Sequence, residues 1–336
     1  MNRRMLVNIG LLGLLLVVLL ALPYFGVSNF VLGLASTILI AAVLASSVNF
    51  LGGDGGMVSL GHGAIAAASA YAVGWASRQG LDSTTQVLLA LGVTLVVSFI
   101  YGLLSMRTSG IYFLMVTLAV GMLIYGLAFR LSSVTGGENG ISGIAAPGDL
   151  HEEWIYYYFV LGIFVLTTAA LWVVSNSPFG ASLRGLRDSE SRMRSLGYNV
   201  AQYKLGAFMI SGTVAGIAGL LAVWHINFVS PSSAGVERSV LLVVMVILGG
   251  IGTLLGPLIG ASIVVLVENV LSSYVDRWPT ALGLIFILVI LFARAGVAGS
   301  VPKVLAKLRG RGPSAAPPGD RSSSKGAPAP ERNHTP

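Results

Sequence analysis

Apolar runs of roughly twenty residues follow one another along most of this chain. They lie at approximately 6–23, 29–50, 59–77, 84–105, 111–129, 153–175, 205–226, 238–251, 256–275 and 279–293. A helix that crosses a bilayer needs about 20 apolar residues, and backbone polar groups inside lipid must be bonded within their own segment. The runs therefore predict an all-α integral membrane protein with about ten transmembrane helices, of which the eighth and tenth are short.

Composition and short motifs exclude several kinds of catalytic and cofactor site. Charged residues make up only 10% of the chain and cysteine is absent, so disulfides, thiolate metal sites and cysteine nucleophiles are excluded. The histidines show no metal-ligand spacing, and neither a phosphate-binding Gly-x-x-x-x-Gly-Lys loop nor a Gly-x-Ser-x-Gly elbow occurs. We expect no cofactor, no metal and no catalytic residue in this chain.

Basic residues gather on one predicted side of the membrane. If Met1 is cytoplasmic and ten spans alternate, sixteen of the twenty Lys and Arg residues are cytoplasmic, mostly in segment 176–204 and in the tail. Positive charge marks the cytoplasmic side of membrane proteins. We therefore expect a transmembrane domain over 1–300 with both chain termini cytoplasmic. Residues 301–336, rich in Pro, Ser and Gly, form a basic tail that is expected to be disordered.

The spacing of glycine and other small residues predicts that the helices pack closely. Small residues recur at four-residue spacing, which lets helix backbones approach closely; examples are Gly212/Gly216, Gly252/Gly256/Gly260 and Ala66/Ala70/Gly74. Two glycine-rich segments, Gly52–Gly63 and Gly249–Gly256, predict interrupted helices, which often line transport pathways. Glu268 lies in the ninth apolar run, where it forms either an interhelical hydrogen bond or part of a pathway.

Segment 176–204 is the longest predicted cytoplasmic loop. Pro178 suits the first turn of a helix, Gly197 suits its end, and Leu183, Leu186, Met193 and Leu196 recur at near-helical spacing. Arg184 and Asp188, four residues apart, are expected to pair. The pattern predicts one short amphipathic helix beside the membrane. It serves either as a lipid-surface helix or as a lever for a cytoplasmic partner.

Five motifs in order resemble the branched-chain amino acid permeases of bacterial ABC importers, LivM-type subunit, over about 45–300. The loop motif comprises Ser177, Phe179, Gly180, Leu183, Arg184, Arg187, Glu190 and Gly197. The other four are Ser59–Ala64, Gly110–Ala119, Thr135–Ile144 and Leu248–Pro257. At Gly56–Val58 the chain lacks a glutamine that is frequent in the family, and related permeases carry urea or short amides.

The resemblance implies a transport subunit of a binding-protein-dependent importer in the bacterial inner membrane. Its partners would be a second homologous permease subunit, two cytoplasmic ATP-binding subunits and a soluble substrate-binding protein. The loop residues above, with Asp188, would couple to the ATPases. Candidate pathway residues are Ser59, Gly61, His62, Gly63, Tyr112, Thr117 and Glu268, and candidate binding-protein docking residues are Glu138, Glu237 and Arg238.

Three readings compete with a branched-chain amino acid importer. A permease for urea or short amides would keep the same architecture. An ion-coupled secondary transporter would need paired charges or ion ligands near mid-membrane, where only Glu268 comes close, and it would work without ATPase partners. A membrane-embedded enzyme or receptor is the third reading.

Overall fold

The computed structural model describes residues 19–26, 28–273, 278–292 and 296–298. The first expected span, 6–23, lies outside these residues except for 19–23, and the tail from residue 301 lies outside them entirely. The longer helices are α2 Asn29–Gly53, α3 His62–Arg78, α4 Ser83–Ser105, α5 Ile111–Arg130, α7 Glu153–Asn176, α8 Pro178–Asp188, α10 Val200–Ile226, α11 Val236–Gly249, α12 Gly256–Asn269 and α13 Trp278–Phe292. The shorter elements are η1 Leu22–Phe25, α6 Ser132–Thr135, η2 Gly137–Asn139, β1 Ile141–Ser142, η3 Gly148–His151, α9 Glu190–Ser195, β2 Phe228–Val229, η4 Pro231–Ala234 and η5 Leu271–Ser273.

Each predicted span from 29 onward corresponds to one helix. By length and composition, α2, α4, α5, α7 and α10 are long and apolar enough to cross a membrane. The predicted eighth and tenth spans are short, as expected, at 14 residues for α11 and 15 for α13. Helix α12 is also shorter than its apolar run, because it ends at Asn269.

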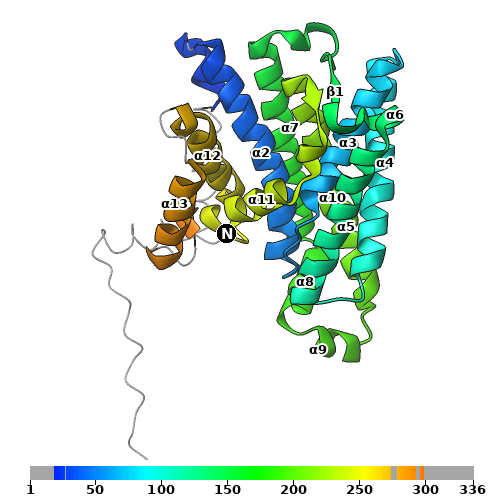
Figure 1. The fold of residues 1–336 in the computed structure, drawn as a ribbon. Coiled ribbons are helices and arrows are strands. Elements are labelled where there is room, and N and C mark those ends of the chain that lie inside the picture. The colour runs from blue at the N-terminus through cyan, green and yellow to red at the C-terminus, as the bar shows by residue number, and fades with distance from the viewer. Residues whose placement is uncertain (1–18, 27, 274–277, 293–295, 299–336) are drawn as a thin grey trace, which may run out of the picture. The chain divides into compact units, whose positions relative to one another are not determined.

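Contacts at the helix ends show that α2, α3, α4, α5, α7 and α10 alternate in direction. At one end, Arg184 in α8 bonds to Asp54 after α2, and Lys204 in α10 bonds to the backbone between α4 and α5. At the other end, Arg78 of α3 bonds to the backbone of Gly140, between α5 and α7. Figure 1 shows α8 and α9 at one end of the bundle and β1 at the other. The predicted alternation of these spans agrees with this arrangement.

The inner face of α4 is polar or small. Its buried residues are Gln86, Ala90, Thr94, Ser98, Tyr101, Gly102 and Ser105, whereas leucine, valine and phenylalanine lie on its exposed face. Lipid is as apolar as a leucine side chain, so close contact, not burial of apolar area, selects the inner face of such a helix. Gly212 and Gly216 of α10 provide that contact, because an added Cβ would overlap Ser98 or Thr94.

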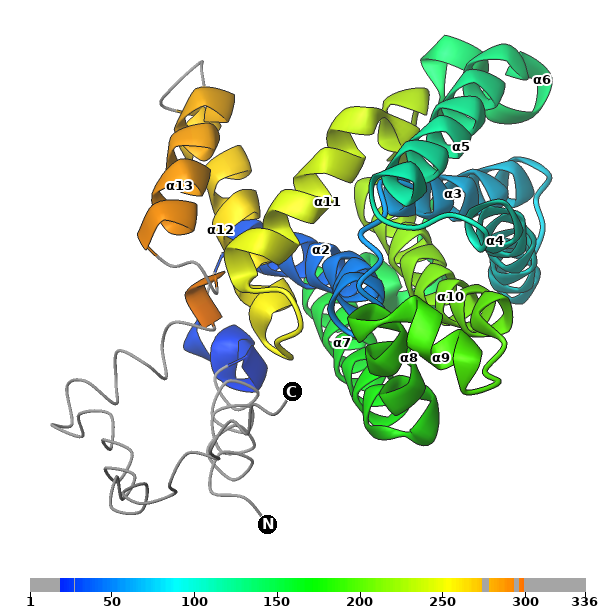
Figure 2. The same cartoon turned by 90° about the horizontal axis from the view of Figure 1, so that it is seen from below.

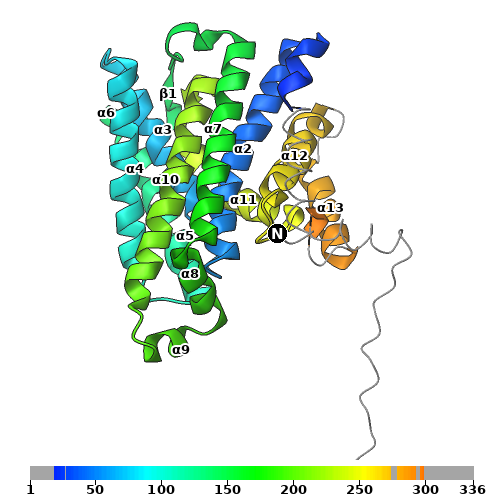
Figure 3. The same cartoon turned by 180° about the vertical axis from the view of Figure 1, so that it is seen from behind.

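Two views show how the helices surround α2. From behind, α10, α7 and α2 lie side by side (Figure 3). From below, α12 and α13 lie on one side of α2, α3, α4 and α5 lie on the other, and α11 runs across from α12 towards α5 (Figure 2). Helix α10 is the most enclosed of the five long helices. In its most apolar stretch of 18 residues, 67% of the residues are buried, against 22% for α5. The bundle therefore leaves α5 as its most open long helix.

Both predicted helix interruptions are present. Helix α2 ends at Gly53 and α3 begins at His62, while α11 ends at Gly249 and α12 begins at Gly256. Gly56 and Gly252 have positive φ angles of 66° and 76°, a region that glycine enters without the steric cost of a side chain. We call the two non-helical stretches, residues 54–61 and 250–255, the first and second breaks.

Candidate functional site

The turn from α7 into α8 depends on Ser177 and Gly180. The Ser177 side chain accepts a hydrogen bond of 3.4 Å from the Gly180 amide, and Pro178 occupies the first helical turn; both are favoured at a helix start. A Cβ on residue 180 would overlap the backbone carbonyl of Ser175. Glycine is therefore required for this close turn.

Arg184 joins three segments of the chain. Its Nη1 donates to Asp54 Oδ1 at 2.9 Å and to the Ser175 carbonyl at 2.7 Å, and Ser175 Oγ donates to the second Asp54 oxygen at 2.7 Å. Hydrogen bonds between ionised groups are stronger than neutral ones. The expected pair between Arg184 and Asp188 is therefore wrong, since Asp54 occupies the guanidinium. Asp188 instead lies 3.6 Å from Arg187 Nε.

Arg187 holds the same loop one turn further along α8. Its Nη1 donates to the carbonyl of Gly53, the last residue of α2. Its aliphatic stem covers Gly56, where an added Cβ would come within 3.1 Å of Arg187 Cβ. The two arginines therefore fix α8 against the end of α2 and the first break.

The other face of α8 packs on the bundle. Leu183 and Leu186 are buried, and the Phe179 ring stacks on Tyr203 of α10 with centroids 5.5 Å apart and planes 19° apart. Gly206 makes room for this ring, since its added Cβ would lie 3.3 Å from Phe179. Helix α8 is thus amphipathic, as predicted, but its apolar face contacts protein.

The segment consists of two helices, so the prediction of one continuous helix is wrong. Ser189 is extended, with φ −164° and ψ 103°, and its side chain accepts from the Arg192 amide to cap α9. The Met193 side chain folds back on Gly185. A serine that bonds to nearby backbone competes with helix continuation. We call residues 177–197 the coupling segment.

Glu190 fixes α9 to α10. Its carboxylate lies 2.6 Å from Lys204 Nζ and 3.8 Å from Arg194. Lys204 is buried and also donates to the Thr108 carbonyl at 2.9 Å. The ion pair therefore ties the coupling segment to the loop between α4 and α5. The segment ends where predicted, at Gly197, which has a φ of 86°.

A second group of predicted residues meets at the start of α3. Ser59 Oγ accepts from the Gly61 amide at 3.1 Å, and Thr117 Oγ1 of α5 accepts from the Leu60 amide at 3.2 Å. His62 is buried; its Nε2 lies 2.6 Å from Ser211 Oγ of α10, which donates to the Ser47 carbonyl of α2 at 2.7 Å.

Glycine lets neighbouring helices approach this site. An added Cβ on Gly61 would overlap Tyr101 of α4, and one on Gly63 would lie 2.8 Å from Ser239 Oγ of α11. The start of α3 therefore touches α2, α4, α5, α10 and α11.

The remaining predicted residues lie apart from this group. Tyr112 is 70% exposed on α5. Glu268, at the end of α12, lies 3.4 Å from Arg238 Nη1 at the start of α11, in a partly exposed ion pair. Glu138 in η2 and Glu237 in α11 are both exposed. The structure thus joins two residues, Arg238 and Glu268, that the sequence analysis had placed in different roles.

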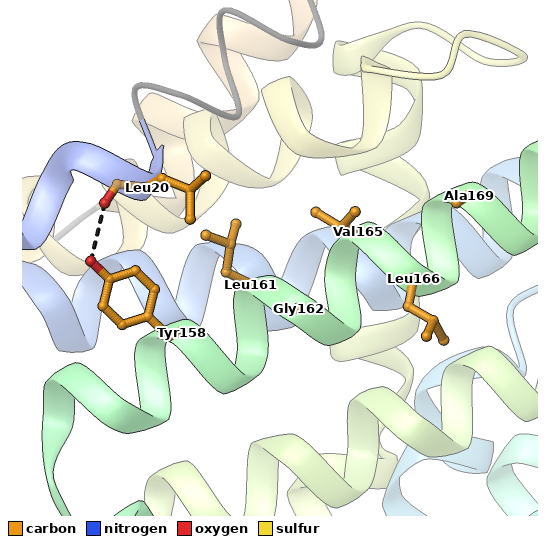
Figure 4. Close-up of a pocket in the computed structure, with 7 residues that line it drawn as sticks. All are labelled: Leu20, Tyr158, Leu161, Gly162, Val165, Leu166 and Ala169. Carbon is orange, nitrogen blue, oxygen red and sulfur yellow. Dashed lines mark hydrogen bonds between the residues drawn. The ribbon is translucent and has the colours of Figure 1, made fainter.

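An apolar groove runs along α7 beside Leu20. Figure 4 shows Leu161, Gly162, Val165 and Leu166 along it, with the Tyr158 hydroxyl donating to the Leu20 carbonyl at 3.1 Å. Apolar side chains make up most of this lining, so we assign no solute to the groove.

Comparison with known proteins identifies the family. Residues 29–295 match the family described as the branched-chain amino acid transport system permease component. The chain belongs to this family. The high-affinity branched-chain amino acid permease protein LivM of Salmonella typhimurium is 28% identical over 313 residues, covering 84% of this chain and 73% of the relative. LivM of Escherichia coli matches to the same extent.

Another relative belongs to a different import system. The permease protein LsrC of an autoinducer 2 import system of Yersinia pseudotuberculosis is 27% identical and covers 74% of this chain and 71% of the relative. Among solved structures, a transporter assigned to the metal-chelate ABC type, in an inward-facing conformation, superposes with a TM-score of 0.44 at 19% identity, covering 82% of this chain and 86% of that chain. The chain is thus a transport permease component of a family with diverse relatives.

Sequence reasoning missed Asp54 as a site residue in this permease. It is the first acidic residue of the chain and stands in a short loop on the same predicted side as the coupling segment. The signal that could have identified Asp54 is an isolated carboxylate on the same predicted side of the membrane as a basic loop. Ser211 and Tyr203 carried no such signal, because both are uncharged and their partners, His62 and Phe179, lie on other helices.

Proposed function

We propose that this chain is the inner-membrane permease subunit of an ATP-driven importer for branched-chain amino acids. The observation that carries the proposal is the anchoring of the coupling segment. Arg184 and Arg187 fix it to α2, Phe179 stacks against α10, and Glu190 bonds to Lys204. A helix that only rests on lipid needs no such set of contacts.

Two separate ATP-binding subunits would grip the coupling segment from the cytoplasm. Moving a two-state permease from 1:99 to 99:1 requires about 5.5 kcal/mol of differential binding. The ATPases would supply this free energy, and the segment must be stiff enough to pass it on. Its exposed residues, among them Asp188 and Arg194, offer charged contacts to these partners.

The pathway would run between this chain and a second homologous permease subunit. The candidate residues Ser59, Gly61, His62, Gly63 and Thr117 surround the start of α3, with Tyr112 and Glu268 as outlying candidates. Interrupted helices at such sites offer unpaired backbone groups to solutes. The open apolar face of α5, which includes Met115 and Leu123, is a suitable surface for a partner subunit within the bilayer.

A soluble binding protein would dock at the opposite end. Glu138 is exposed there. Glu237 and Arg238, also exposed, lie at the start of α11, which packs through Ser239 on the start of α3, so they are outlying docking candidates. Surface charges of both signs steer partners into register. Under this proposal the coupling segment and both chain termini face the cytoplasm.

Reconstitution tests the proposal. The chain is purified with its genetically neighbouring permease, ATPase and binding-protein subunits in liposomes, and uptake of labelled leucine, valine and urea is compared with and without ATP. We expect ATP-dependent uptake of leucine and valine. Preference for urea would favour the amide permeases suggested by Gly56–Val58, and uptake by the chain alone without nucleotide would favour a secondary transporter.

A further inference from the structure

The side chain of Asn49, near the end of α2, contacts the second break. The side chain of this α2 residue donates from Nδ2 to the Thr253 carbonyl at 3.0 Å and accepts on Oδ1 from the Gly252 amide at 2.7 Å. Both backbone groups belong to the second break, where no helix bonds them. Non-helical backbone within a membrane protein must find such partners inside the protein. An amide side chain supplies the required donor and acceptor together.

Gly53, one turn further along α2, brings the backbones themselves into contact. An added Cβ on this residue would lie 2.7 Å from the Gly252 Cα and 2.9 Å from its nitrogen. Any side chain at position 53 would therefore push α2 away from the second break.

The same turn of α2 also holds the coupling segment. Arg187 donates to the Gly53 carbonyl and Arg184 to Asp54, while the Asp54 amide continues the helix by bonding to Phe50. Residues 49–54 are thus bonded to α8 on one side and to the α11–α12 connection on the other. Helix α11 in turn carries Ser239 against Gly63, at the start of α3.

We propose that the last turn of α2 transmits movement of the coupling segment to the second break, with Asn49 as the positioning residue that joins them. The inference rests on the proposed function. It adds that the second break and the last turn of α2 move as one unit when the coupling segment moves.

The first test compares Asn49→Ala with wild type in the complete reconstituted transporter. Uptake and ATP hydrolysis are measured on the same assembled complexes. We expect the uptake per ATP hydrolysed to fall about tenfold, within the usual range for coupling between sites, while hydrolysis itself is retained. The control is Ser262→Ala, whose hydroxyl donates to the Leu258 carbonyl in its own helix at 2.7 Å. The uptake per ATP hydrolysed of this variant should stay at the wild-type value.

Gly53→Ala provides a second route to the same loss, since it pushes α2 away from the second break without altering Asn49. If the Asn49→Ala transporter fails to assemble, the Gly53→Ala transporter tests the inference in its place. An unchanged ratio of uptake to hydrolysis, or a parallel loss of both, overturns the inference. If wild type itself takes up solute without ATP, the proposed function fails instead, so the two failures are distinguishable.

A covalent link between α2 and the second break tests whether Asn49 transmits movement or only stabilises the fold. The chain contains no cysteine, so the double variant Asn49→Cys/Thr253→Cys introduces the only thiols of this subunit. Reduced, it should be uncoupled like Asn49→Ala. Bridged by a short thiol-to-thiol reagent, it should regain the wild-type ratio, because α2 and the second break move as one unit. Failure of the bridge to restore coupling would overturn the inference.

Discussion

The two ends of the bundle are held together by different chemistry. At the end with the coupling segment, long charged side chains reach between helices: Arg184 to Asp54, and Glu190 to Lys204. At the opposite end the contacts are made to or between backbone groups, and Arg78 donates to the Gly140 carbonyl. There β1 pairs antiparallel with β2, with Ile141 opposite Val229, and an added Cβ on Gly140 would overlap the Val229 carbonyl.

This difference matters for what each end does. Charged bonds from α8 reach α2 and α7, and one from α9 reaches α10. They fix the position of the coupling segment, as the proposed transmission of force would require. Backbone pairing between glycine-rich loops fixes a surface and leaves its side chains, such as Glu138, free to contact a partner. Under the proposed function, the first end would transmit movement and the second would dock the binding protein.

The largest effect is expected from Gly180→Ala at the transmitting end. The new Cβ would enter the space of the Ser175 carbonyl, so α8 must shift against α7. We expect uptake to fall about 100-fold, since small misplacements of coupled groups have effects of this order. Uptake by the reconstituted complex is the measurement. Gly162→Ala is the matched control, because nothing lies within 4 Å of its added Cβ; equal loss in both would contradict the prediction.

A smaller loss is expected when the Arg184–Asp54 pair is broken. Arg184→Gln and Asp54→Asn should each reduce uptake per ATP hydrolysed by about fivefold, and the double variant should be no worse than either single variant. The pair is partly exposed, with side-chain exposures of 39% and 19%, so its coupling energy is on the order of 1 kcal/mol. A double-mutant cycle on the uptake ratio measures it. Strictly additive losses would show that the two residues act separately.

At the opposite end, Gly140→Ala should weaken docking and leave transmission intact. The substitution strains a φ of 66° and places a Cβ against Val229, so the β1–β2 pairing is displaced. We expect about threefold weaker stimulation of ATP hydrolysis by the binding protein, corresponding to less than 1 kcal/mol, with basal hydrolysis unchanged. Gly143→Ala isolates the effect of backbone strain, since its φ is 77° but its surroundings are open. Lowered basal hydrolysis would argue against the division between the ends.

The smallest effect is expected from Glu268→Gln. Its carboxylate forms a partly exposed ion pair with Arg238 at 3.4 Å, and such pairs contribute about 0–1 kcal/mol. Uptake by the variant should stay within about twofold of wild type. A tenfold loss, with normal expression, would instead make Glu268 a residue of the pathway.

The sequence by itself determined the helices from residue 29 onward, the alternation of those from α2 to α10 and the two breaks. These features follow from local composition: runs of apolar residues must become helices in lipid, and glycine clusters interrupt them. It also located the helix start at Ser177 and the end of the segment at Gly197, because capping depends on neighbours within a few residues.

Only the tertiary structure decided which residues meet. Arg184 was expected to pair within its helix, yet its partner Asp54 is 130 residues away, and Asn49 bonds to a backbone group 204 residues away. No local periodicity encodes such contacts. They depend on how the small residues pack, because that packing decides which ends of which helices come together. Ser189 divides the coupling segment for a related reason: its cap and the fold of Met193 onto Gly185 outweigh the helical spacing of the leucines.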